Sequence, residues 1–157
     1  MTGSSQGDQG RVRIEMALPA PIEDVYAAWT RPEAMARWLA PMGAADVEAD
    51  VRVGGRFRVV MIGDGMTIQH TGEYLIVEPP RRLSFTWQSP YTGAEPSVVT
   101  VTLTADGGRT RLLLLHERLP EDAAASHRGG WGAILRRLVE EVLRSSDRDE
   151  VAEPTEG

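Results

Sequence analysis

Residues 121–144 read EDAAASHRGGWGAILRRLVEEVLR. The apolar residues of this stretch recur at the spacing of one helix face; they are Trp131, Ile134, Leu135, Leu138, Val139 and Val142. Glu121 and Asp122 open the stretch, where acidic side chains complement the positive end of a helix dipole. We therefore predict a long helix from Glu121 to about Arg144 with one apolar face to bury.

Three glycines interrupt the first half of that helix, at 129, 130 and 132. Glycine is a poor helix former, costing about 1 kcal/mol relative to alanine in a helix interior. We expect either a kink at this point or a close approach of the helix to a sheet.

The chain ahead of the helix alternates apolar and polar residues, the period of strands with one buried face. The strands are predicted over 12–18, 46–53, 56–61, 67–77, 83–88, 99–104 and 109–117. Glycine, proline and aspartate pairs separate most of them, as turns require. The pattern predicts seven strands.

Two short helices are expected between the first and second strands, over 22–30 and 33–39. Pro21 suits the first turn of a helix, and Pro32 ends the first helix because the residue before proline disfavours helical geometry. The order is strand, two helices, six strands, long helix. This order predicts an α+β fold in which a curved antiparallel sheet encloses the C-terminal helix and an apolar pocket.

The chain has the length of one domain, at 157 residues. We expect a folded domain over 11–144, with disordered polar segments at 1–10 and, as an acidic tail, at 145–157, because neither has enough apolar surface to offset its ordering entropy. Residues 1–10 lack the basic and apolar regions of a secretory signal.

Composition excludes several classes of protein. The net charge of −6 does not match nucleic acid. No apolar run approaches the roughly 20 residues that span a bilayer. The absence of cysteine excludes disulfides and thiolate metal sites, and it fits a cytoplasmic location.

Several short motifs, in order, resemble one family. The segment 19–41 reads PAPIEDVYAAWTRPEAMARWLAP, followed by GGRF at 54–57, GEY at 72–74, EPPRRL at 78–83 and FTW at 85–87. TRL at 110–112, HE at 116–117 and GW at 130–131 complete the series. The chain resembles the START-like (SRPBCC) superfamily and, more narrowly, the family named for the activator of heat-shock-protein-90 ATPase. The resemblance implies the helix-grip fold of the birch-pollen allergen, with a cavity between the sheet and the last helix.

Strand alternation, combined with this resemblance, predicts which side chains face the helix. In the last strand we expect Leu112, Leu114 and His116 to point inward. His70, Tyr74 and Ile76 share a face of another strand. An apolar cavity with a few polar groups is typical of small-molecule sites. The predicted ligand-binding residues are Trp38, Met61, His70, Tyr74, Trp87, His116, Trp131 and Leu135.

A structural interpretation competes with this one. Large aromatics dominate protein cores, so the tryptophans can fill the space between helix and sheet rather than frame a pocket. A histidine on an apolar strand face is often a core residue with a backbone partner. His127 is expected at the surface.

The sequence contains no motif for metal binding or for nucleophilic catalysis. The histidines lack metal-ligand spacing, and Glu117 faces away from His116 on a strand. There is no nucleophile elbow, and without lysine there is no phosphate-binding loop. We therefore predict no metal, no cofactor and no catalytic residue.

Three functions remain open. The first is non-catalytic binding of a small apolar or amphipathic molecule. The second is a polyketide cyclase- or dehydratase-like enzyme that uses an inward histidine or tyrosine as general acid–base; it requires His70, Tyr74 and His116 to converge on one empty point. The third, a co-chaperone-like protein interaction, is implied only by the family name.

A last expectation concerns assembly. Leu113 and Leu115 are predicted on the outer face of the sheet, near Val98. Exposed aliphatic patches often mark interfaces, so one hypothesis is a homodimer through these residues, and the alternative is that they are ordinary scattered surface residues.

Overall fold

Seven antiparallel strands form one sheet in the order β1-β7-β6-β5-β4-β3-β2. The computed structural model describes residues 10–39, 44–63, 65–90, 92 and 95–152. The elements are β1 (Val12–Leu18), α2 (Ile22–Thr30), α3 (Pro32–Trp38), β2 (Ala44–Ala49), β3 (Arg56–Gly63), β4 (Met66–Glu78), β5 (Arg82–Trp87), β6 (Ser97–Asp106), β7 (Arg109–Glu117), the short 3-10 helix η1 (Glu121–Ala123) and α4 (Ala124–Ala152). This is the predicted α+β helix-grip architecture.

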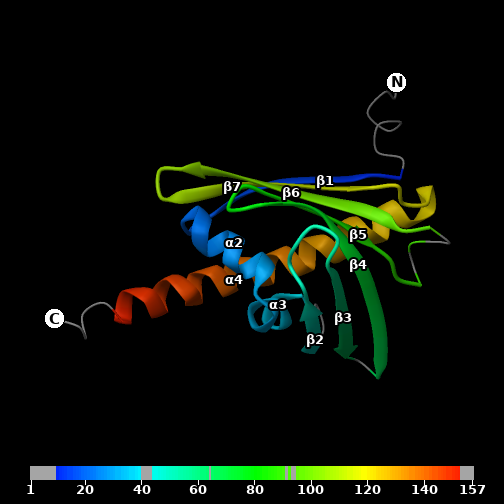
Figure 1. Cartoon of the computed structure of the whole chain (residues 1–157), viewed down its shortest axis with the longest axis horizontal. Helices are drawn as coiled ribbons and strands as arrows, with labels where there is room; N and C mark the ends of the chain where they lie inside the picture. The colour runs from blue at the N-terminus through cyan, green and yellow to red at the C-terminus, as the bar shows by residue number, and fades with distance from the viewer. Residues whose placement is uncertain (1–9, 40–43, 64, 91, 93–94, 153–157) are drawn as a thin grey trace.

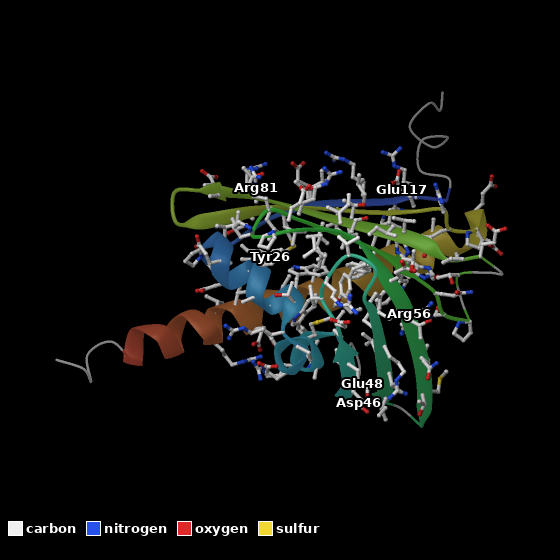
Figure 2. All side chains as sticks on the ribbon, viewed as in Figure 1. Tyr26, Asp46, Glu48, Arg56, Arg81 and Glu117 are labelled. Atoms are coloured by element: carbon white, nitrogen blue, oxygen red, sulfur yellow. The ribbon has the colours of Figure 1, made fainter. Side chains whose placement is uncertain are left out.

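The sheet curves over α4, which crosses beneath it, and α2 and α3 lie beside the helix on the same side (Figure 1). The C-terminal part of α4 extends past the edge of the sheet (Figure 1). Charged side chains such as Arg81 and Glu117 lie along the outer face, whereas Tyr26 lies between α2 and the sheet (Figure 2). The core is therefore the single layer between sheet and helices.

The inward face of the sheet is a continuous apolar band. Leu112, Leu114 and His116 of β7 are all fully buried, as predicted. The register continues this band across the sheet, since His116 pairs with Val99 and Leu114 with Val101 on β6. The apolar stripe of α4 packs against it, with Trp131, Ile134, Leu135, Leu138 and Val142 all buried.

Gly72 on β4 leaves room for the Phe57 ring of the neighbouring strand β3. A Cβ at Gly72 would collide with the Thr86 carbonyl oxygen and the Phe57 ring. Glycine here therefore allows Phe57 to pack between strands, where its ring lies 5.5 Å from that of Tyr74 and 5.3 Å from that of Phe85.

Two strand predictions are corrected. β2 ends at Ala49, because the chain after it turns back and both Gly54 N–H and Gly55 C=O bond the backbone of Tyr74. Val53, predicted in the strand, is 64% exposed. On β4 a register shift between Tyr74 and Ile76 places Ile76 opposite Ser84 and Val77 opposite Leu83. The bulge moves Ile76 off the inward face, since a single inserted residue reverses the alternation.

The long helix also differs from its prediction. It begins at Ala124, after the 3-10 turn, and runs past Arg144 to Ala152. Residues 145–152 contain neither glycine nor proline, and an existing helix propagates at low cost. Residues 1–9 and 153–157 lie outside the described part of the chain, and the division into a domain at 11–144 with flanking segments stays a prediction.

Candidate functional site

A cavity of about 320 Å³ lies between the sheet and the first half of α4. Its volume falls at the lower end of the ~300–1,000 Å³ usual for small-molecule sites. The side chains around it come from β3, β4, β5 and α4; they are Met61, Ile68, His70, Trp87, Ser126, His127, Gly130, Trp131 and Ile134. Most of this lining is apolar.

Four of the eight predicted ligand-binding residues line this cavity. They are Met61, His70, Trp87 and Trp131. The other four, Trp38, Tyr74, His116 and Leu135, are buried elsewhere in the core. Alternation places them on the correct face, but they lie behind the cavity wall.

Trp38 and Tyr74 belong to the aromatic interior. The Trp38 indole Nε1 donates to the Ala28 carbonyl over 2.9 Å, which connects α3 to α2. Tyr74 borders a second cavity of only about 10 Å³. Burial raises the pKa of the Tyr74 hydroxyl, so this group stays protonated. Leu135 is part of the apolar stripe on α4.

His116 holds two wall residues of the cavity in place. The Trp131 indole Nε1 donates to His116 Nδ1 over 2.9 Å, and His116 Nε2 lies 2.7 Å from Ser97 Oγ. Ser97 Oγ in turn donates to the Trp87 carbonyl over 2.6 Å. Because an indole N–H only donates, Nδ1 must be the acceptor and Nε2 carries the proton. His116 therefore connects β7, β6 and α4 and has both ring nitrogens satisfied.

Burial lowers the pKa of His116 to about 3, with His127 and His70 acting in the same direction. The ring is neutral at pH 7, as its hydrogen bond from Trp131 requires. His116 is thus a positioning residue for the wall and has no ring nitrogen left for a ligand.

His70 has the opposite environment. Its side chain lies on the cavity wall and is only 7% exposed. The ring stacks on Trp87 with centroids 4.6 Å apart and planes inclined by 30°. Within the described part of the chain, Nδ1 has no hydrogen-bond partner. Burial lowers the pKa of His70 to about 4, against the opposing effect of the Val59 backbone.

The prediction missed five lining residues. Ile68, Ser126, His127, Gly130 and Ile134 were not among the expected site residues. His127, expected at the surface, is half-buried; its Nδ1 donates to the Ala123 carbonyl over 2.9 Å, and its ring lies 5.2 Å from that of His116. Helical spacing from His127 through Trp131 to Ile134 carried the signal, since these positions share one face.

The glycines of α4 do not mark a close approach. A Cβ at Gly129, Gly130 or Gly132 would meet nothing within 4 Å. The helix is continuous through them. Gly130 instead leaves the cavity open on the α4 side, because a side chain there would enter it.

The geometry required for the acid–base alternative is not present. Of its three candidates, only His70 reaches the cavity, while His116 is fully bonded and Tyr74 lies deeper. No cluster of three metal-ligating side chains occurs among the described residues. None of the described helices is long and apolar enough to cross a membrane.

Comparison with known proteins identifies the family. The model of the family described as Activator of Hsp90 ATPase homolog 1-like protein matches residues 19–142. A search of curated proteins found no match.

Solved structures agree with this match. Protein NE0264 from Nitrosomonas europaea has a TM-score of 0.76 at 21% identity, covering 88% of this chain and 97% of that chain. Protein CV1439 from Chromobacterium violaceum has a TM-score of 0.73 at 27% identity, covering 85% and 97%. The protein encoded by gene BPP1335 from Bordetella parapertussis has a TM-score of 0.68 at 31% identity, covering 85% and 74%.

The element order, the helix-grip sheet and the family model agree over most of the chain, and the protein belongs to the Activator of Hsp90 ATPase homolog 1-like family, within the START-like superfamily.

Proposed function

We propose that this protein binds a small apolar or amphipathic molecule, without turning it over, in the cavity between the sheet and α4. The observation that supports this most is that two tryptophans frame the cavity instead of filling it. Trp87 and Trp131 line it with ring centroids 5.6 Å apart. Trp29 and Trp38 pack together in the core, with centroids 4.6 Å apart.

The wall tryptophans are held from behind. Trp131 donates to His116, and the Trp87 ring lies between His70 and Phe57, at centroid distances of 4.6 and 5.9 Å. Collapse of the cavity would break these contacts. A preformed apolar cavity of this kind gains binding free energy from apolar surface removed from water, at about 25 cal/mol per Å².

The test uses two glycines on α4. Gly130→Phe adds a ring to the cavity lining, and Gly129→Phe adds the same ring to an exposed neighbouring position outside the lining; neither Cβ meets an atom within 4 Å. Each change replaces one helix-interior glycine by the same residue, so the two effects on helix propensity are matched.

The expected result is that 2-naphthol, followed by isothermal titration calorimetry, binds the wild type and Gly129→Phe alike. Gly130→Phe should bind at least tenfold more weakly. Equal affinities of all three proteins, or no binding to the wild type, would refute the proposed site.

Two other expectations stay proposals. The homodimer would use Val98, Leu113 and Leu115, which are half-buried on the outer face. Their cross-strand neighbours include Arg13 and Glu15, so the apolar surface is bordered by charge. Light scattering at micromolar concentration tests it, and a monomer refutes it. A cytoplasmic location rests on the absence of cysteine.

A further inference from the structure

We propose that the ligand is an uncharged planar aromatic molecule with a hydroxyl group, and that this hydroxyl forms its hydrogen bond with the imidazole of His70. The inference rests on the proposed function and names the class of molecule that the same cavity selects.

His70 is the polar group that most needs a partner. Its side chain is 7% exposed, and its Nδ1 has no hydrogen-bond partner among the described residues. A buried polar group without a partner is unfavourable, and native structures rarely leave one. Nδ1 is enclosed, so we infer that a ligand in the cavity, which His70 lines, would meet the ring at Nε2.

A hydroxyl group fits this nitrogen in either tautomer. A neutral imidazole donates from one nitrogen and accepts at the other, and the unpartnered Nδ1 of His70 does not fix which is which. A hydroxyl both donates and accepts, so it pairs with Nε2 in both cases. A carboxylate only accepts and an ammonium only donates.

Charge on the ligand is also disfavoured. Of the residues that the structure describes, no arginine, aspartate or glutamate lines the cavity. His70 is neutral at pH 7, because burial lowers its pKa to about 4. Moving an ion from water into such a site without a countercharge is costly. The ligand group that meets His70 is therefore an uncharged one.

Flat rings on the wall favour a flat ligand. Trp87 pairs with two other rings of the cavity lining: its plane is inclined by 30° to His70 and by 42° to Trp131, at centroid distances of 4.6 and 5.6 Å. Aromatic pairs in stacked or edge-on arrangements add binding beyond their buried area. The aliphatic side chains of Met61, Ile68 and Ile134 complete the lining.

The test compares three molecules with one ring system: 2-naphthol, naphthalene and 2-naphthoate. Titration of the wild-type protein at pH 7.5, followed by NMR, should give at least tenfold tighter binding of 2-naphthol than of either other compound. Equal binding of 2-naphthol and naphthalene overturns the inference and leaves the proposed function intact. Tighter binding of 2-naphthoate also overturns it. If none of the three binds, the proposed function itself fails.

Two variants on β4 test whether His70 causes the preference for 2-naphthol over naphthalene. His70→Phe keeps a ring on the inward face of β4. Gln69→Phe places the same ring at the preceding position, which is exposed. The ratio of naphthalene to naphthol dissociation constants should fall to about twofold or less in His70→Phe and stay unchanged in Gln69→Phe. An unchanged ratio in His70→Phe contradicts the assignment.

A measurement on the unaltered protein covers the case in which His70→Phe does not fold. The ¹⁵N chemical shifts of the three histidines are followed during titration with 2-naphthol. A new hydrogen bond should move the ring-nitrogen shifts of His70 and leave those of His116 in place. Shifts confined to other histidines would overturn the inference.

Discussion

His116 and His70 have the same chemistry and the same inward orientation, but their surroundings give them different roles. His116 has both ring nitrogens in hydrogen bonds, to Trp131 and Ser97. His70 lies against the cavity with an enclosed, unpartnered Nδ1. One histidine stabilises the wall, and the other is available to a ligand.

The first prediction concerns His116→Phe. This change leaves the Trp131 indole N–H buried without an acceptor, and Ser97 loses a donor. Each unsatisfied buried group costs about 1–3 kcal/mol, so the free energy of unfolding should fall by about 2–4 kcal/mol. Urea denaturation measures it. His127→Phe is the control, because its bond to Ala123 is half-exposed, and it should cost less than about 1 kcal/mol. Equal losses would mean that the buried hydrogen bonds of His116 add nothing.

The second prediction is a loss of stability in mild acid. Burial lowers the folded-state pKa values of His70 and His116 from 6.5 to about 4 and about 3. Between these values and 6.5 the unfolded chain binds more protons than the folded one, so stability rises with pH there. The free energy of unfolding should be level above about pH 7 and fall as the pH drops from 6.5 toward 4.

Denaturation at a series of pH values checks the acid prediction. In His70→Phe this slope should be smaller, because one of the two groups is gone. A slope that is unaffected by the variant would show that other groups cause the loss.

Among the elements, α3 and α4 are joined by a bidentate ion pair. Arg37 donates to both carboxylate oxygens of Glu141, over 2.9 and 2.8 Å, and Glu141 is only 2% exposed. Burial acts to raise the pKa of Glu141, but the hydrogen bond and charge of Arg37, with a smaller effect from Arg144, lower it overall. The pair keeps a buried carboxylate ionised and fixes α3 against the helix that lines the cavity.

The third prediction separates the two arginines near Glu141. Arg37→Met should lower the free energy of unfolding by about 1–3 kcal/mol, less than for a fully buried pair because Arg37 is half-exposed. The Nη2 of Arg144 lies 3.5 Å from the same carboxylate. Arg144→Met should therefore lower the free energy of unfolding by less than about 0.5 kcal/mol. Thermal or urea unfolding of both variants checks this, and equal effects would contradict the bidentate geometry as the cause.

Periodicity was sufficient to predict the elements but not all their ends. The α4 stripe and the inward face of β7 follow directly from spacing. The bulge after Tyr74 was not predictable, because residues 74–77 are all apolar and therefore give no alternation that would reveal a change of face.

Only four of the eight predicted site residues line the cavity. Alternation assigns a side chain to a face of the sheet, not to a depth behind that face. Met61, His70 and Trp87 reach the cavity, whereas Tyr74 and His116 share the inward side and lie behind its wall. Depth depends on the curvature of the sheet and on neighbouring rings, which come from distant parts of the chain.

At the scale of the molecule, the tryptophans divide the interior into two spaces. Trp87 and Trp131 border both the main cavity and the second one of about 10 Å³. Trp29 lines the second cavity, and its indole N–H has no hydrogen-bond partner among the described residues. The wall formed by Trp87 and Trp131 thus decides how much of the interior a ligand can enter.

The most direct test of the central claim is an NMR titration of the four tryptophan indole N–H groups with 2-naphthol. Binding in the cavity should shift the signals of Trp87 and Trp131, which line it, while Trp38, bonded to Ala28 in the core, stays in place. Saturable shifts of that pattern support a ligand site between the sheet and α4. No shift at saturating probe, or shifts as large at Trp38 as at Trp87 and Trp131, would contradict it.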